Sequence, residues 1–252
     1  MTLISLTDLH DLASRVLVAA KTSPENAAAV ARALVKADAD GIPSHGVSRL
    51  PAYADQAKAG KVDGFANPDV SFPVKASIRV DARSGFAYPA IEQAQKVALE
   101  RIAEMGILGV AIGNSHHAGV AGHHVEAFAD QGYVALGFTN SPAGIAPWGG
   151  NRAIYGTNPV AFACPVMGKP SIVVDFSTSK VARGKIKLAA DKGESIPEGW
   201  AVDADGNPTT DASAAMSGSL LPMGDAKGAA LVMMVEILAA TLTGSNHGFE
   251  AS

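Results

Sequence analysis

The 252-residue sequence has a single cysteine, Cys164, and only 17% charged residues. One cysteine excludes an internal disulfide framework and is typical of a protein kept in a reducing cytoplasm. The low charge content, beside 48% hydrophobic residues, excludes a disordered chain or a coiled coil. The net charge of −4, without a long basic run, gives no electrostatic support to nucleic-acid binding. We therefore expect a cytoplasmic globular protein without a nucleic-acid partner.

Long hydrophobic runs are also missing. The longest apolar stretch, residues 229–242, is interrupted by Glu236 and is shorter than the roughly 20 residues that span a bilayer. The N-terminal residues lack the basic start and apolar core of a signal peptide. The sequence therefore predicts no association with a membrane.

Several familiar motifs are absent. There is no GxGxxG dinucleotide fingerprint, no P-loop and no GxSxG nucleophile elbow. The residues Asp203, Asp205 and Asn207 resemble the start of a calcium loop, but Gly206 is misplaced and no glutamate closes the loop. A polar turn is the better interpretation of this segment.

The order of hydrophobic patterns predicts an α/β (α+β) fold. The first 60 residues have helical periodicity, with Ser5 as an N-cap and Ser23-Pro24 as a cap followed by proline at the first helical position. Further helices are expected at 89–105, 119–131, 181–190 and 225–243, with strands at 77–80, 107–112, 133–139, 160–163 and 172–176 and a hairpin at 200–208. Helices followed by alternating strands and helices indicate a helical N-terminal subdomain and a mixed α/β domain.

One candidate site is Ser44-His45-Gly46, between two helical segments, with Arg49 about one helical turn further on. Histidine exchanges protons near neutral pH, and arginine binds carboxylates with two hydrogen bonds. Reduction of a 2-oxo acid needs both functions, because the oxygen is protonated as hydride arrives while the carboxylate is held. The alternative is a helix cap by Ser44, with His45 on the surface and Arg49 in a salt bridge.

A second candidate site is the segment 115–126, which follows a predicted strand and holds two histidine pairs separated by small residues. Small residues let a ligand approach the backbone, and a helix N-terminus favours an anion. Two alternatives stay open. His116, His123 and Glu126 could bind a metal, although three or four convergent ligands are usual. The histidines could also be simply solvated or packed.

Three weaker segments complete the candidates. Residues 156–159 form a turn before a strand, and residues 175–180 are acidic and rich in hydroxyl groups at a strand end. Residues 224–228 open the last helix, where backbone N–H groups and Lys227 could hold a phosphate. The alternative for this last segment is an ordinary helix start, with Asp225 complementing the helix dipole.

Five segments in this order resemble one family. The pattern DGxxSHGxxRLxxY (40–53), GNSHHAGVAGHH, YGTNPVAFACP, VDFSTSKVARGK and LLPMGDAKGAAL are similar to the malate/L-lactate dehydrogenase family of nicotinamide-dependent oxidoreductases. The resemblance covers essentially the whole chain. It implies a largely antiparallel sheet of the family's own type rather than a Rossmann fold, which explains the missing GxGxxG. The resemblance also implies a homodimeric enzyme that binds NAD or NADP and interconverts a small 2-hydroxy acid and its 2-oxo acid.

The resemblance also implies roles for individual residues. His45, beside Ser44, would be the proton donor, and His116 matches the catalytic base of some relatives. Arg49 would bind the substrate carboxylate, and Thr157 would face substrate or cofactor. Lys185 stands where some relatives have an aspartate that orients the histidine, and a charged lysine cannot accept that hydrogen bond. No metal ligand is implied. The residues expected to contact the cofactor are His117, Ala118, Gly119, Val120, Ala121, Asp175, Phe176, Ser177, Thr178, Ser179, Lys227 and Gly228.

Within the family, SHHAGVAGHHVE, APWGG, SKVARGK and ESIPEGW are most similar to the 3-sulfolactate dehydrogenase branch. Reduction of a cyclic imino acid, as in Δ1-piperideine-2-carboxylate reductases, and a non-catalytic remnant that only binds ligand are the alternatives. Family members are longer, so we expect a C-terminally truncated chain. Its helical subdomain at 1–70 would pack with the missing segment, its cofactor and substrate domain would lie at 71–252, and apolar surface would be exposed.

Overall fold

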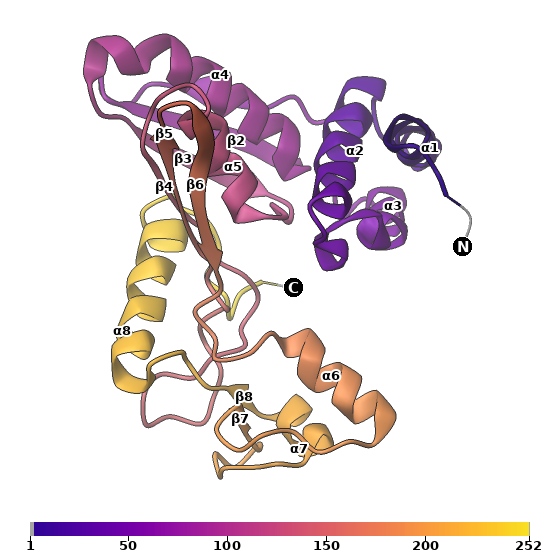
Figure 1. Cartoon of the computed structure of the whole chain (residues 1–252), viewed down its shortest axis with the longest axis vertical. Helices are drawn as coiled ribbons and strands as arrows, with labels where there is room; N and C mark the ends of the chain where they lie inside the picture. The colour runs from indigo at the N-terminus through magenta and orange to yellow at the C-terminus, as the bar shows by residue number, and fades with distance from the viewer. Residues whose placement is uncertain (1–2, 252) are drawn as a thin grey trace. The chain divides into compact units, whose positions relative to one another are not determined.

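The computed structural model describes residues 3–251, which fold into two compact units, Met1–Phe128 and Ala129–Ser252 (Figure 1). The boundary expected at residue 70 lies inside the first unit. No helix in the described range is long and apolar enough to cross a membrane.

The first unit begins with the expected helices. They are α1 (Leu6–Ala19), α2 (Pro24–Ala39) and α3 (Leu50–Ala59), which pack together, with the short 3-10 turns η1 (Pro43–His45) and η2 (Val47–Arg49) before α3. The Ser5 hydroxyl accepts from the Asp8 N–H and the Ser23 hydroxyl from the Asn26 N–H, which confirms both predicted N-caps. Leu17, Val30 and Leu34 are fully buried between these helices. The helical N-terminal part of the fold is thus confirmed.

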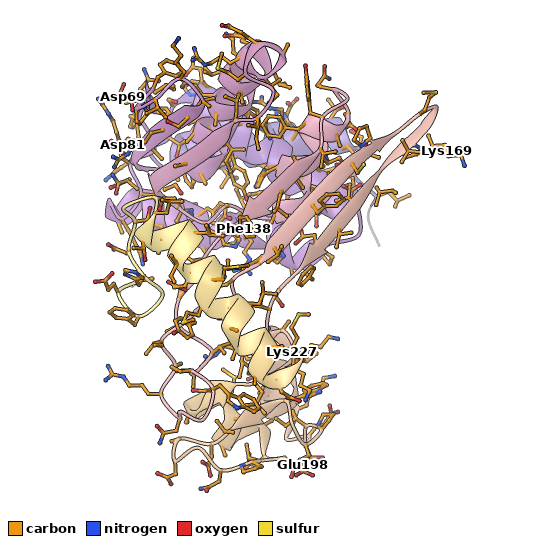
Figure 2. The ribbon with its side chains drawn as sticks, turned by 90° about the vertical axis from the view of Figure 1, so that its left-hand side faces the viewer. Asp69, Asp81, Phe138, Lys169, Glu198 and Lys227 are labelled. Carbon is orange, nitrogen blue, oxygen red and sulfur yellow. The ribbon has the colours of Figure 1, made fainter. Side chains whose placement is uncertain are left out.

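The rest of the first unit is a three-stranded sheet with two helices. The strands are β1 (Asp69–Ser71), β2 (Ser77–Gly85) and β3 (Gly109–Ser115), and the helices are α4 (Ala87–Met105) and α5 (Ala121–Ala129). β1 pairs antiparallel with β2, so that Asp69 lies opposite Asp81 (Figure 2). β2 and β3 are parallel and are joined by α4, since parallel strands need a long crossover. The crossover brings the end of β3, and the histidine segment after it, beside the end of β2.

The second unit contains an antiparallel sheet in the order β4-β5-β6, with strands β4 (Ala135–Phe138), β5 (Val160–Val166) and β6 (Lys169–Phe176). Figure 2 shows Phe138 and Lys169 at separate ends of this sheet. The remaining elements are α6 (Arg183–Lys192), β7 (Ala201–Val202), α7 (Ala212–Ser217), β8 (Ser219–Leu220), α8 (Asp225–Glu236) and the π-helix η3 (Ile237–Thr241). With two antiparallel sheets and one mixed sheet, the expected mixed and largely antiparallel fold is confirmed.

Two predicted elements of the second unit differ in detail. The expected hairpin at 200–208 is reduced to one bridge between Val202 and Pro208, because β7 pairs mainly with the distant β8. The expected helix at 225–243 is α-helical only to Glu236 and then widens into η3. The sequence did not predict β1, α7 or β8, which are too short for a periodic pattern.

Large apolar side chains are exposed in both units, among them Leu12 and Val16 on α1 and Ile172 and Val174 on β6.

Candidate active site

The segment between α2 and α3 presents Ser44, His45 and Arg49 in the first unit. The turn is fastened by Asp38 on α2, whose carboxylate accepts the Val47 N–H at 2.8 Å. The same carboxylate occupies the space that a Cβ at Gly46 would need, so glycine is required between His45 and Val47. Two short 3-10 turns then carry the chain into α3. This arrangement fixes the direction in which His45 leaves the backbone.

Two hydrogen bonds connect these three residues, one between side chains and one from a side chain to the backbone. The Ser44 hydroxyl lies 3.0 Å from His45 Nδ1, and Arg49 Nε donates to the Ser44 carbonyl oxygen at 2.7 Å. The alternative of a Ser44 helix cap is wrong, since no side chain caps η2 or α3. Within residues 3–251 no carboxylate pairs with Arg49 either, so its terminal NH₂ groups are available to an anion.

His117 lies beside His45. The segment after β3 places the two rings in a stack with centroids 5.6 Å apart and planes 24° apart. Tyr53 on α3 also contacts His117, because its hydroxyl oxygen lies 2.6 Å from His117 Nδ1. The structure therefore joins two predicted site residues that are far apart in the sequence, one from each histidine segment.

His116 points elsewhere. Its Nε2 lies 2.5 Å from the Gln56 side-chain oxygen, and its ring meets Tyr53 and Phe86 edge-on. Its Nδ1 is buried and has no hydrogen-bond partner in the described chain. The His116 ring is half-buried against α3.

His116 and His117 both have lowered pKa values and are neutral at pH 7. Desolvation lowers the pKa of His116 to about 4, with a smaller contribution from Lys61. Desolvation, followed by Arg49 and His45, lowers the pKa of His117 to about 3, although part of its surface remains exposed. Burial raises the pKa of Tyr53, which stays a neutral phenol.

These shifts predict an acid-sensitive fold. His116 and His117 have folded pKa values below the ordinary 6.5, so the unfolded chain binds more protons below that pH. Above about pH 6.5 these two histidines should not lower the free energy of unfolding. As the pH falls from about 6.5 toward 4 and then 3, the free energy of unfolding should decrease. Urea titrations at several pH values measure it. A His116→Gln/His117→Gln variant should lose less stability over this interval, and an equal loss would contradict the assignment.

The second histidine pair serves other contacts. His123 Nε2 lies 2.9 Å from an Asp40 carboxylate oxygen, and His124 Nε2 lies 2.6 Å from the Ala118 carbonyl oxygen. Lys36 and Glu126 form an ion pair at 2.6 Å. His116 and His123 thus face different partners, and within residues 3–251 no three His, Cys, Asp or Glu side chains are grouped as metal ligands would be.

The small residues between the histidine pairs are shaped by packing. Gly119 has φ +72°, and a Cβ there would overlap the Tyr88 hydroxyl. Ala118, Val120 and Ala121 connect this glycine to the start of α5 and are half-buried. The glycine is explained by the tyrosine, and a cofactor contact in this segment remains a prediction.

The remaining predicted residues lie in the second unit, where three of the segments meet. The Thr178 N–H and hydroxyl both donate to the Thr157 carbonyl oxygen at 2.8 Å. The Met223 N–H donates to the Thr178 carbonyl oxygen at 2.9 Å, and Lys180 pairs with Asp225 at 3.7 Å. Residues 157, 175–180 and 223–228 therefore form one neighbourhood.

The start of α8 in this neighbourhood offers hydrogen-bond donors to an anion. No side chain caps the start of α8, whose Gly224 N-cap is exposed, so its first N–H groups can bind an anion. Lys227 (Figure 2) and Lys180 are exposed cations beside it. In contrast, Thr178 and Ser179 are buried and donate to carbonyl oxygens, which makes them supports of the strand end. Ser177 contacts Ser179 at 3.2 Å, and Asp175 and Phe176 end β6.

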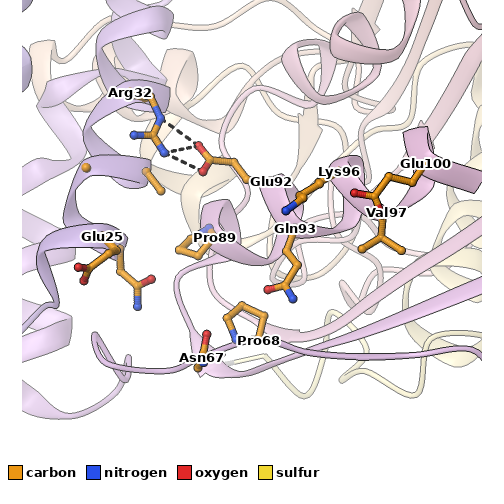
Figure 3. A pocket seen from close by; sticks show the side chains of 13 residues that line it. Glu25, Arg32, Asn67, Pro68, Pro89, Glu92, Gln93, Lys96, Val97 and Glu100 are labelled. Carbon is orange, nitrogen blue, oxygen red and sulfur yellow. Dashed lines mark hydrogen bonds and ion pairs between the residues drawn. The ribbon is translucent and has the colours of Figure 1, made fainter. Parts of the chain in front are cut away.

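The first unit also has an open groove away from these residues. An open groove of about 690 Å³ runs between α2 and α4 and is crossed by the Arg32–Glu92 ion pair (Figure 3). None of the predicted site residues lines it.

Sequence reasoning missed Tyr53, Tyr88 and Gln56 as members of the site. Tyr53 closes the 40–53 pattern, and this position was the available signal for it. Tyr88 and Gln56 lie within helical segments where nothing distinguishes them from packing residues, so only their contacts reveal them.

Comparison with known proteins adds independent findings. The family model described as malate/L-lactate dehydrogenase matches residues 4–252. The (2R)-3-sulfolactate dehydrogenase (NADP(+)) of Chromohalobacter salexigens is 53% identical over 252 residues, covering 99% of this chain and 75% of that protein. The Δ1-pyrroline-2-carboxylate/Δ1-piperideine-2-carboxylate reductase of Pseudomonas putida is 42% identical, over 98% of this chain and 73% of its own length.

Solved structures are similarly close. The Δ1-piperideine-2-carboxylate reductase from Pseudomonas syringae pv. tomato superposes with a TM-score of 0.96 at 42% identity, covering 100% of this chain and 76% of its own. The sulfolactate dehydrogenase from Methanocaldococcus jannaschii gives a TM-score of 0.91 at 32% identity, covering 100% of this chain and 72% of its own. Both similarities extend through the two units.

Proposed function

The chain belongs to the malate/L-lactate dehydrogenase family, and we propose that it is an NAD(P)-dependent oxidoreductase that interconverts a 2-hydroxy acid and its 2-oxo acid. The proposed substrates are of the 3-sulfolactate, malate or lactate type, because the sulfolactate dehydrogenase is a relative at 53% identity. We further propose a cytoplasmic homodimer.

One observation carries the proposal. Ser44, His45 and Arg49 form a linked group in which an imidazole is held by a hydroxyl and a guanidinium keeps its terminal NH₂ groups available. Reduction of a 2-oxo acid requires a proton donor for the oxygen and a group that binds the carboxylate, and this segment offers both within about one helical turn.

The roles of the residues follow from this geometry. NAD(P)H, when bound, supplies the hydride that adds to the carbonyl carbon. His45 gives its proton to the carbonyl oxygen as the C=O π bond breaks, and it takes that proton back in the reverse direction. Ser44 holds the His45 ring through Nδ1, and Arg49 binds the carboxylate. The neutral His116 is the second candidate for the acid/base role.

Several residues of the second unit are proposed to hold the cofactor. Lys227 and the N-terminal N–H groups of α8 would bind its phosphates. Gly228 allows the start of α8 to lie close to Met223, because a Cβ there would overlap the Met223 carbonyl oxygen. We propose that Thr157 and residues 175–179 are further cofactor contacts of the second unit, and that residues 117–121 are the cofactor contacts of the first unit.

Reduction of a cyclic imino acid is the second candidate. It is favoured by the similarity to the Pseudomonas syringae reductase, with its TM-score of 0.96. The same residues serve both reactions, because an imine carbon accepts hydride as a carbonyl carbon does and the nitrogen takes the proton.

The proposal is tested by assaying pyruvate, oxaloacetate, sulfopyruvate and Δ1-piperideine-2-carboxylate with NADH and with NADPH, following loss of the reduced cofactor. We expect at least one 2-oxo acid to be reduced. Turnover of the imine alone would replace the first candidate by the second. If no substrate reacts while nicotinamide fluorescence still reports binding, the chain is a non-catalytic binder.

A further inference from the structure

Two buried tyrosines lie in line with His117. Tyr53 on α3 is 3% exposed, and Tyr88 on α4 is 4% exposed. Their hydroxyl oxygens lie 3.3 Å apart, and the Tyr53 hydroxyl lies 2.6 Å from His117 Nδ1. The three groups therefore form a continuous chain of hydrogen bonds from the interior of the first unit to the ring stacked on His45.

The direction of these hydrogen bonds follows from the need of each buried hydroxyl proton for an acceptor. If His117 Nδ1 donated to Tyr53, the two hydroxyls could use only one of their two protons between them, and the other proton would have no acceptor among the hydrogen bonds of residues 3–251. If Tyr88 donates to Tyr53 and Tyr53 to Nδ1, both hydroxyl protons are used. A buried unsatisfied donor is costly, so the second direction is favoured.

We propose that Tyr53, which accepts from Tyr88 and donates to His117 Nδ1, is a positioning residue that holds His117 as the neutral tautomer with its proton on Nε2. The His117 ring is then held in one orientation, and Nδ1 has no proton to donate. The Nε2–H group becomes a hydrogen-bond donor with a fixed direction. In the described chain Nε2 of His117 has no hydrogen-bond partner, so this donor is available to a ligand.

The surroundings support a fixed arrangement. Phe86 and His116 meet the Tyr53 ring with centroids 5.8 and 4.8 Å away, which restricts its movement. The backbone of Gly119 closes over the Tyr88 hydroxyl, where a Cβ would overlap it. Both tyrosines have raised pKa values through burial, so both remain hydrogen-bond donors.

The charged and titratable groups that act on His117 also favour its neutral form. Burial has the largest effect on its pKa, followed by Arg49, His45, His116 and His124, all of which lower it. If the proposed function holds, a neutral imidazole donor beside His45 would polarise the substrate oxygen without competing for the proton that His45 delivers. The tautomer itself does not depend on that function.

The test is the nitrogen NMR spectrum of the ¹⁵N-histidine-labelled full chain without ligand, with His117 assigned from a His117→Gln variant. We expect a pyridine-type signal for Nδ1 and a pyrrole-type signal for Nε2 at pH 7. A protonated Nδ1 in the unmodified protein would overturn the proposal, and this result needs neither activity nor a variant of Tyr53.

Two variants separate the hydrogen bond from packing. Tyr53→Phe removes the donor to Nδ1, so the His117 pKa should rise by about one unit, and the Nδ1–H tautomer should appear. Tyr88→Phe makes the same change in the same cluster but leaves the Tyr53 donor, so Nδ1 should stay unprotonated and the pKa should move less. A Tyr53→Phe protein with an unchanged or lowered His117 pKa would contradict the proposed direction.

Discussion

Replacement of His45 by alanine is expected to lower kcat for 2-oxo acid reduction by about 10²–10⁴-fold, the usual contribution of a positioned general acid. The substrate oxygen must then take its proton from water. The fold should survive, because His45 is only half-buried and its ring is not part of a buried cluster. Steady-state rates, together with NADPH binding by fluorescence, measure the effect on chemistry separately from the effect on the cofactor site.

Two further variants complete this test, one at a histidine outside the site as a control and one at the neighbouring arginine. His10 on α1 lies outside the site, and its ring lies 3.3 Å from an Asp11 carboxylate oxygen, so His10→Ala should keep the full rate. Arg49→Gln should act mainly on KM, because it removes the carboxylate partner and leaves the proton donor. A His45→Ala protein with the activity of the parent would end the assignment of His45 as donor and leave His116 as the candidate.

Replacement of Gly228 by alanine is expected to destabilise the protein by about 3 kcal/mol. In most helices this change would be favourable, since glycine costs about 0.5–1 kcal/mol relative to alanine. Here the new Cβ would overlap the Met223 carbonyl oxygen, and the Met223 N–H is already fastened to Thr178 at 2.9 Å. Neither backbone can give way without opening the start of α8.

Gly184 provides the matched control, because it also lies in the first turn of a helix, α6, but has open space around its Cβ position. Gly184→Ala should be neutral or slightly stabilising, by up to about 1 kcal/mol. Urea denaturation at pH 7 compares the two variants. If Gly228→Ala were as stable as Gly184→Ala, the close approach of α8 to Met223 would be disproved.

Much of the fold could be predicted because its signals are local. The N-caps Ser5 and Ser23 act on N–H groups three residues away, and the glycines at 60 and 106 follow the helices they end. Strand pairing was less accessible. The predicted hairpin at 200–208 keeps one bridge, between Val202 and Pro208, while β7 pairs mainly with β8, which begins 17 residues beyond its end.

The sequence by itself determined the helical N-terminal part, the positions of the longer strands, and the presence of a histidine–arginine pair within one turn of chain. It did so because caps and periodicity act over a few residues. Only the tertiary structure decided that His117 lies on His45 while His116 turns to Gln56, and that Tyr88 and Tyr53 continue this group into the core. The Tyr53–His117 contact joins residues 64 positions apart, and a contact of that range depends on how α3 packs against the end of β3.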